Sequence, residues 1–200
     1  MSLLHWQSVD RMGGSLKINA ADLCSLSVSP RVRKFGREMV LAAEGHPILD
    51  VACGGGRNGV WLAHLGGRVV GIDVDLRGIE AERETKEKGS LNDAFRRIKL
   101  LNCDLIREPW PYPPQSVGGI VNIHFLEESL LPRFCDSLIS GGLLILETVE
   151  ARGENYFELP KAGFLREALE QSLSLLVYNE RSVGPHGVDA VTVKLVGKKL

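Results

Sequence analysis

Short apolar runs alternate with longer stretches in which apolar residues recur at helical spacing. The apolar runs predict strands near residues 48–53, 68–73, 97–102, 118–123 and 142–149. Helical spacing predicts helices near residues 56–65, 76–88 and 128–139. Strands and helices that alternate in this way predict a mostly parallel sheet with right-handed crossovers.

The end of the chain breaks this alternation. Residues 175–180 and 190–196 are two extended stretches, and the turn region between them contains Gly184, Pro185 and Gly187. No helix fits between the stretches, so they predict an antiparallel hairpin. The expected fold class is therefore α/β, with a doubly wound, mostly parallel sheet of seven strands that ends in a C-terminal hairpin. The ordinary dinucleotide-binding arrangement has no such hairpin.

A glycine-rich segment follows the first predicted strand. Residues 48–59 read as an apolar strand, an acid, a glycine turn and a helix start, which brings backbone N–H groups to a place where a ligand can approach closely. The next strand ends on Asp73, whose carboxylate is placed to accept hydrogen bonds from ribose hydroxyls. The segment predicts a nucleotide site.

The glycine spacing alone leaves the nucleotide open. Gly54, Gly56 and Gly59 also fit the dinucleotide fingerprint, so an NAD-dependent oxidoreductase is one interpretation. Asp50 favours another, because a pyrophosphate gains nothing from a carboxylate four residues before the first glycine. S-adenosylmethionine (SAM) carries a sulfonium and an ammonium, so a nearby acid suits it electrostatically.

Four segments together resemble one family. Residues 50–58, Asp-x-x-Cys-Gly-x-Gly-Arg-Asn, resemble the first motif of class I SAM-dependent methyltransferases, particularly the tellurite-resistance (TehB-like) branch. Asp73, residues 102–105 and residues 141–148 resemble later motifs in the same order. The resemblance covers roughly residues 40–200, and it implies the Rossmann-like methyltransferase fold, SAM as cofactor and S-adenosylhomocysteine as product.

The resemblance also implies a set of cofactor-binding residues. Asp73 would hold the ribose and Asp104 the adenine, while Gly54 and Gly56 would hold the methionine portion. Asp50 would support the loop or reach the ammonium through water. The expected cofactor-binding set is Asp50, Cys53, Gly54, Gly56, Arg57, Asn58, Asp73, Val74, Asp104, Leu105 and His124.

The acceptor side is less defined by the sequence. His124 follows the fourth strand and is a candidate base, although in this fold the position more often contacts the cofactor or packs. Relatives tend to carry an Asn and then an Arg hereabouts, so His124 and Glu128 are departures. Phe125, Tyr156 and Phe157 are candidate substrate contacts. Because the sulfonium methyl is already activated, direct in-line transfer needs mainly positioning of the acceptor.

Residues outside these motifs have expected structural roles. Residues 1–40 are expected to form an N-terminal helical or cap segment, with Arg31 and Arg37 on a helix, and residues 41–200 the methyltransferase domain. Such a segment folds over the cofactor in many methyltransferases. We expect Asp75 to cap the following helix, Glu82 to lie on a solvated helical face, and residues 110–114 to form a surface connection.

Composition fits one globular domain and a small acceptor. The 200 residues are 44% hydrophobic and 24% charged, and the net charge of −1 gives no sign of a nucleic-acid-binding protein. The four cysteines form no CxxC pair, so no structural metal is expected. We expect a cytoplasmic enzyme, since no apolar run approaches membrane-spanning length. Two alternatives stay open: an RNA methyltransferase, and a SAM-binding regulatory protein without transferase activity.

Overall fold

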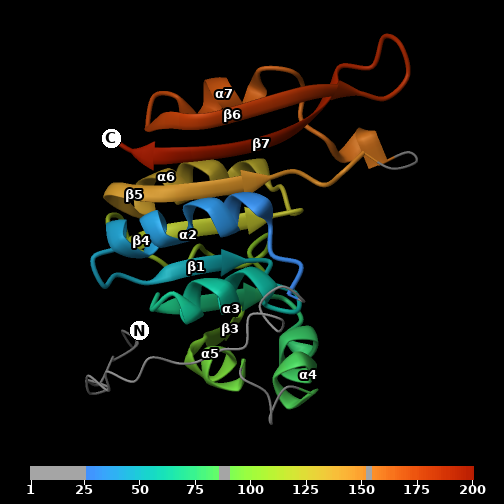
Figure 1. Cartoon of the computed structure of the whole chain (residues 1–200). Coiled ribbons are helices and arrows are strands. Elements are labelled where there is room, and N and C mark those ends of the chain that lie inside the picture. The colour runs from blue at the N-terminus through green and yellow to red at the C-terminus, as the bar shows by residue number, and fades with distance from the viewer. Residues whose placement is uncertain (1–25, 86–90, 152–154) are drawn as a thin grey trace.

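One mixed sheet of seven strands organises the chain in a computed structural model, which describes residues 26–85, 91–151 and 155–200. The strand order is β3-β2-β1-β4-β5-β7-β6, and every neighbouring pair from β3 to β5 is parallel. β7 runs antiparallel to both β5 and β6 (Figure 1). The predicted α/β class, the parallel core and the terminal hairpin are thereby confirmed.

The strands span Ile48–Val51 (β1), Val69–Asp73 (β2), Lys99–Asn102 (β3), Val117–Ile123 (β4), Leu138–Glu147 (β5), Leu173–Val183 (β6) and Ala190–Lys199 (β7). The α-helices span Pro30–Ala42 (α2), Arg57–His64 (α3), Arg77–Thr85 (α4), Asn92–Arg97 (α5), Leu131–Ser137 (α6) and Phe164–Leu169 (α7). Two 3-10 helices span Glu128–Leu130 (η1) and Asn155–Glu158 (η2). No helix in these described ranges is both long and apolar enough to cross a membrane.

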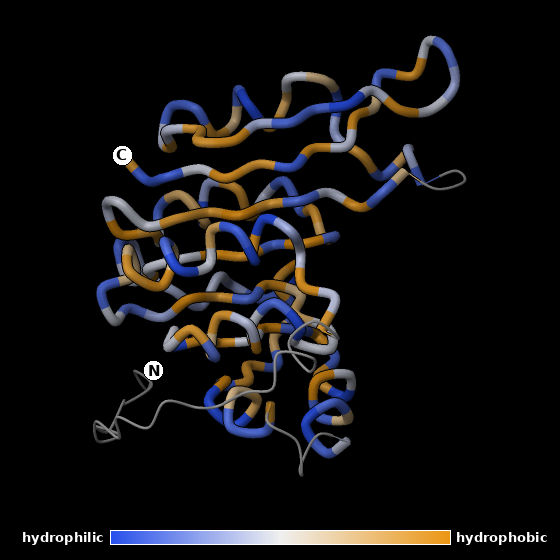
Figure 2. The backbone as a smooth tube through the Cα atoms, in the orientation of Figure 1, coloured by the Kyte–Doolittle hydropathy of each residue, from blue (hydrophilic) through white to orange (hydrophobic). Residues whose placement is uncertain are grey.

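Apolar side chains fill both faces of the sheet. On one face, Met39 of α2 and Phe95 of α5 are fully buried together with side chains of α3. On the other, Phe134 of α6 and Leu169 of α7 are fully buried. Figure 2 shows the hydrophobic colour concentrated along the central strands, while much of the edge strand β6 is hydrophilic. The two-sided burial explains why β1 and β4 read as continuous apolar runs in the sequence.

α2 lies unusually close to the sheet because two glycines of β4 leave room for it. A Cβ added to Gly118 would lie 2.4 Å from the Ala43 Cβ, and one added to Gly119 would lie 2.7 Å from the Met39 Cγ. Ser29 caps α2, since its Oγ accepts the Arg31 N–H at 3.2 Å. This packing fixes the start of α2 beside the carboxyl ends of β4 and β5.

The connection from β3 to β4 is a loop with exposed prolines, as predicted, but its two aromatic side chains pack inward. Trp110 and Tyr112 pack on the core, and the Trp110 ring meets the ring of Phe134 edge-on, with centroids 5.3 Å apart. Parallel strands are usually joined by a helix that covers the sheet. Here no helix forms between residues 103 and 116, and the aromatic side chains fill that layer instead.

Candidate active site

The carboxyl ends of the parallel strands meet at one edge of the sheet, the right-hand edge in Figure 1. There the turn between β1 and α3 requires glycine at one position. Gly56 has φ +74° and precedes α3 directly, and an added Cβ would lie 2.3 Å from the Ile79 Cδ1. Gly54 also has a positive φ, yet an added Cβ there would meet nothing within 4 Å. The turn is therefore closed toward α4 and open beside Gly54.

A cavity of about 560 Å³ lies over this turn. It is lined by Leu26, Ser27, Asp50, Ala52, Cys53, Gly54, Gly55, Arg57, Asn58, Glu82, Phe95, Ile123 and His124. Six of the residues predicted to bind the cofactor are among them: Asp50, Cys53, Gly54, Arg57, Asn58 and His124. The structure thus brings together half of a site that the sequence placed on separate segments.

Three lining residues have a backbone conformation that is rare outside glycine. Ser27 has φ +46°, Ala52 φ +52° and His124 φ +64°. Such conformations cost of order 1–3 kcal/mol each and tend to gather at functional sites. No sequence signal marks Ser27 or Ala52, because neither residue type favours positive φ. Glu82, which was expected on a solvated face, is exposed but also lines the cavity.

Asp50 is buried beneath the glycine turn. Asp50 is 3% exposed, and its Oδ2 accepts the Gly59 N–H at 2.8 Å. Burial raises the pKa of this carboxyl from 3.8 to about 7, although the Gly59 hydrogen bond and the Arg57 charge both lower it. Asp50 therefore supports the start of α3 through Gly59, and a cationic ligand nearby would favour its ionised form.

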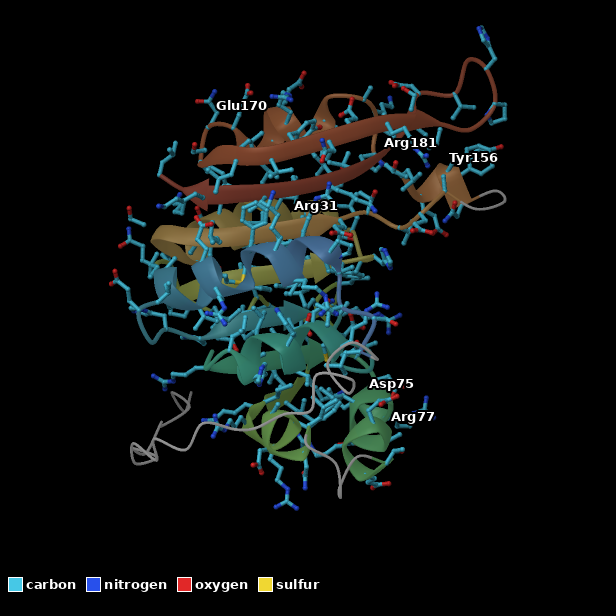
Figure 3. The ribbon with its side chains drawn as sticks, viewed as in Figure 1. Arg31, Asp75, Arg77, Tyr156, Glu170 and Arg181 are labelled. Carbon is cyan, nitrogen blue, oxygen red and sulfur yellow. The ribbon has the colours of Figure 1, made fainter. Side chains whose placement is uncertain are left out.

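Asp73, at the end of β2, holds the other side of the turn. Its Oδ2 accepts the Gly54 N–H at 2.8 Å and its Oδ1 accepts the Asp75 N–H at 3.0 Å. Each carboxylate oxygen retains a second acceptor position for a ligand. Asp75 in turn accepts the Arg77 N–H at 3.0 Å and pairs with the Arg77 guanidinium, which agrees with its predicted capping role (Figure 3).

Val74, Asp104 and Leu105, which were also predicted to bind the cofactor, lie beyond this cavity, after the ends of β2 and β3. Asp104 Oδ1 accepts the backbone N–H groups of Ile106 and Arg107, so its carboxylate is turned into its own loop. Leu105 is buried in the core. Val74, by contrast, is 65% exposed. Among the predicted cofactor-binding residues, Val74 is the one with a large exposed apolar side chain. Nearby in the sequence to Asp104, Ile106 is also exposed, at 66%, although no sequence signal marks it.

A buried polar network ties the segment before α2 to the site. The Ser29 N–H donates to Asn58 Oδ1 at 3.0 Å, and Ser29 Oγ donates to Glu147 Oε1 at 2.6 Å. Arg31 Nη1 lies 3.8 Å from the same Glu147 oxygen. Residues 26–29 are thereby held against the cavity, which agrees with a covering N-terminal segment. Residues 1–25, the rest of the predicted 1–40 segment, lie outside the described residues.

A second cavity, of about 260 Å³, begins at His124. It is lined by His124, Phe125, Leu126, Thr148, Val149, Glu158 and Leu159. Phe125, one of the predicted substrate contacts, is among these lining residues. Tyr156 instead packs against the hairpin, where a Cβ added to Gly184 would lie 3.3 Å from its ring, and Phe157 is 75% exposed. Their neighbours Glu158 and Leu159 line the cavity in their place.

Cys53 lines the cavity as a buried thiol that stays protonated. It is 8% exposed, and burial raises its thiol pKa to about 12, with the charges of Asp50 and Asp73 adding to the effect. Cys53, Cys103 and Cys135 are free thiols, and Cys24 lies outside the described residues. In the part of the chain that the structure describes, no group of three ligating side chains could hold a metal ion.

The segment that builds the first cavity matches a known family. Residues 48–142, from the start of β1 to the bend within β5, match the family model described as a methyltransferase domain. The chain contains a methyltransferase domain. A search of curated proteins gave no match.

Solved structures of methyltransferases share the fold of this domain. TehB from Haemophilus influenzae superimposes with a TM-score of 0.62 and 20% identity, over 87% of this chain and 63% of that chain. The chain therefore spans less than two thirds of TehB. Geranyl diphosphate C-methyltransferase from Streptomyces coelicolor A3(2), solved with S-adenosyl-L-homocysteine, superimposes with a TM-score of 0.56 and 14% identity, over 85% of this chain and 81% of that chain. The tRNA (m1A58) methyltransferase TrmI from Aquifex aeolicus superimposes with a TM-score of 0.53 and 17% identity, over 86% of this chain and 70% of that chain.

The family match confirms the predicted methyltransferase domain, and the superpositions confirm the predicted fold, which TehB shares. The methyltransferase domain carries the antiparallel β7 that the ordinary dinucleotide arrangement lacks, as the hairpin pattern predicted. Its acceptor is not given by the fold, because the structural neighbours act on substrates as different as geranyl diphosphate and tRNA.

Proposed function

We propose that this protein transfers a methyl group from SAM to a small-molecule acceptor by direct in-line displacement. The observation that carries the proposal is the pair of cavities that meet at His124. The larger one lies on the glycine turn, and the smaller one lies over β4 and β5. A donor in the first cavity and an acceptor in the second would face each other at this residue.

The charges of the larger cavity suit SAM better than a dinucleotide. Asp50 and Glu82 line it, and Asp73 lies beside Gly54, whereas Arg57 is the cationic side chain in the lining. A pyrophosphate would meet these carboxylates unfavourably, while a sulfonium and an ammonium gain from them. The open space beside Gly54 leaves room for a ligand close to the backbone.

Cofactor contacts follow from where each predicted residue lies. Asp73 would accept hydrogen bonds from the ribose hydroxyls. The exposed Val74 would pack on the adenine ring, with Asp104 and Leu105 at its polar edge. Gly54 and Gly56 would hold the methionine portion, with the backbone of Cys53 nearby. Arg57 and Asn58 would close the turn, since Asn58 fixes Ser29 over the cavity.

Transfer then depends on positioning. Bound SAM supplies a methyl group already activated by the sulfonium. The chain aligns the acceptor with that methyl carbon and excludes water, and orientation of this kind supplies about 7–11 kcal/mol of a barrier. His124 is held by its backbone, whose N–H donates to the Glu147 carbonyl at 2.8 Å. From there its imidazole can accept the acceptor's proton where the acceptor is a hydroxyl.

A small acceptor fits the dimensions on the acceptor side. The cavity beyond His124 holds about 260 Å³, which suits a small organic molecule and is too confined for a folded RNA. The net charge of −1 also offers no general attraction for a polyanion. Both observations favour a small molecule over a nucleic acid.

Calorimetric titration of the purified chain with SAM, S-adenosylhomocysteine and NAD tests the donor. We expect SAM and S-adenosylhomocysteine to bind and NAD not to bind. Asp73→Ala should weaken SAM binding by roughly 1.5–3 kcal/mol, because it removes a charged hydrogen-bond partner. The variant Asp136→Ala, on the exposed side of α6, is a matched control that should bind like the parent. NAD binding without SAM binding would contradict the proposal.

A further inference from the structure

A third cavity, of about 440 Å³, lies at the antiparallel end of the sheet. It is lined by Thr148, Val149, Glu150, Ala151, Asn179, Glu180, Arg181, Thr192 and Lys194. Nothing in the family match covers this region, because the match ends at residue 142. The cavity therefore lies in a part of the chain to which the family match assigns no role.

The three cavities adjoin one another through shared lining residues. His124 lines both the 560 Å³ and the 260 Å³ cavity, and Thr148 and Val149 line both the 260 Å³ and the 440 Å³ cavity. A molecule that extends from His124 past Thr148 would point toward the third cavity. Because of this adjacency, the far cavity is placed to hold the distal end of an acceptor whose reactive atom lies at His124.

Strand register gathers polar side chains beside the third cavity. Lys194 of β7 lies opposite Glu147 of β5 on one side and opposite Asn179 of β6 on the other. Directly opposed residues share a face of the sheet. On β7, Val196 is two residues after Lys194 and packs in the core under α2. Thr192 is two residues before Lys194 and lies opposite Arg181 of β6. The side chains of Lys194 and Arg181 are therefore on the face that α2 covers.

Arg31, at the start of α2, spans this row of residues. Its Nη1 lies 3.8 Å from Glu147 Oε1, and its Nη2 donates to Asn179 Oδ1 at 2.6 Å. Figure 3 shows Arg31 over the strands next to β6 and Arg181 farther along toward the hairpin. Arg31 thus bridges β5 and β6, and Lys194 is on β7, the strand between them.

The carboxylates of this region already have partners, whereas two cations do not. Glu147 accepts from Ser29 and pairs with Arg31, and Glu180 Oε2 accepts from the Tyr178 hydroxyl and the Gly163 N–H. Glu150 is likewise engaged. Within residues 26–85, 91–151 and 155–200, neither Arg181 nor Lys194 forms an ion pair. Glu150 and Glu180 keep their charges, so what favours an anion here is that the Arg181 and Lys194 side chains have no carboxylate paired with them among the described residues.

We propose that Arg181 and Lys194 form an anion-binding subsite for the methyl acceptor, which is a small molecule with a carboxylate or phosphate group. This inference rests on the proposed function, since it places the reactive end of the acceptor at His124. A guanidinium binds planar oxyanions through two parallel hydrogen bonds, and an ammonium adds a point charge. Glu147, opposite Lys194 in the sheet, pairs with Arg31 and accepts from Ser29, so its carboxylate is held by other partners than Lys194.

NMR titration of the chain saturated with S-adenosylhomocysteine tests the subsite with three probes of similar size. Benzoate and phenyl phosphate carry the two anionic groups, and benzamide is the neutral control. We expect both anions to shift the backbone amide signals of residues 148–151, 179–181 and 192–194, and benzamide to leave them unchanged. The anion that binds more tightly identifies the group that the subsite prefers.

Matched variants separate this subsite from general surface charge. Arg181→Gln and Lys194→Gln should each weaken binding of the preferred anion on the order of tenfold, because each removes one charge-assisted hydrogen-bond donor. Arg133→Gln and Lys198→Gln remove the same charges at exposed positions on α6 and the far end of β7. These two controls should bind the anion like the parent.

Three results would each overturn the subsite. These are equal shifts with benzamide, unchanged anion affinity in both Arg181→Gln and Lys194→Gln, and tighter binding of a short single-stranded RNA than of phenyl phosphate to these residues. Failure of the proposed function is distinguishable, because it would appear as no binding of S-adenosylhomocysteine, whereas the probe titration can still be run on the free chain.

Discussion

At the scale of single residues, Asp50 gives the site its pH dependence. Burial raises its pKa from 3.8 to about 7, so the folded chain holds a proton that the unfolded chain has lost over this interval. Its contribution to stability is therefore present below about pH 3.8 and lost as the pH rises through about 7. Asp50→Asn should remove this loss, which amounts to on the order of a few kcal/mol.

Urea denaturation of both proteins at pH 5 and pH 8 measures the effect. The parent should lose free energy of unfolding between the two pH values relative to Asp50→Asn, whose amide oxygen can still accept the Gly59 N–H. Parallel pH profiles for the two proteins would show that Asp50 does not titrate in this range.

The same carboxyl should make SAM binding depend on pH. A cationic ligand favours the ionised form of Asp50, so SAM affinity should increase as the pH rises from about 6 to 8. Calorimetry across this range measures it, and S-adenosylhomocysteine, which lacks the sulfonium charge, should show a smaller increase. An Asp50→Asn variant that keeps the full pH dependence of the parent would assign it to another group.

At the scale of elements, the start of α3 depends on the absence of one side chain. Gly56→Ala would place a methyl group 2.3 Å from Ile79 Cδ1 and hold a non-glycine residue at φ +74°. Left-handed backbone costs roughly 1–2 kcal/mol by itself. Gly45→Ala is the matched control, because Gly45 has φ +82° and an added Cβ there meets nothing within 4 Å.

Thermal or chemical unfolding should thus show Gly56→Ala to be destabilised by more than Gly45→Ala. The difference between them is the cost of the contact with α4. Equal destabilisation would mean that Ile79 moves aside without cost and that α4 does not restrict the turn.

Most elements could be predicted from the sequence because burial on both faces gives each central strand an apolar run of its own. The predicted 97–102 strand begins at Lys99, since residues 92–97 form α5, a helix of six residues that is too short for a periodic pattern. The aromatic layer between β3 and β4 was missed for a different reason. Prolines around Trp110 and Tyr112 indicate a loop correctly, but local sequence does not reveal that the rings pack on Phe134.

At the scale of the whole molecule, the glycine-turn side of the candidate site could be predicted from the sequence, and the proposed acceptor side largely could not. Asp50, Gly54 and Asp73 lie on consecutive segments whose spacing carries the motif. The proposed acceptor side joins Ser29, Glu147 and Lys194, which are far apart in the sequence and are brought together only by the fold. Single residues without a local motif give no signal of such a meeting.

Ser29 is the residue that links these regions, and Ser29→Ala tests its weight. The variant would leave the buried Glu147 carboxylate without the 2.6 Å hydrogen bond and α2 without its cap. We expect a loss of roughly 1–3 kcal/mol of unfolding free energy, measured by urea denaturation. Ser182→Ala, at an exposed position of β6, is the control and should change stability little. A loss no larger than that of the control would contradict the role of Ser29.

The same serine joins the two sides of the proposed site. Its N–H donates to Asn58 of α3, beside the larger cavity, and its hydroxyl donates to Glu147 at the end of β5. If binding in one cavity changes affinity in the other through this link, the effect must be mutual: the donor changes the affinity for the acceptor by the same factor as the acceptor changes the affinity for the donor. A single buried side chain would then set how strongly the two binding events depend on each other.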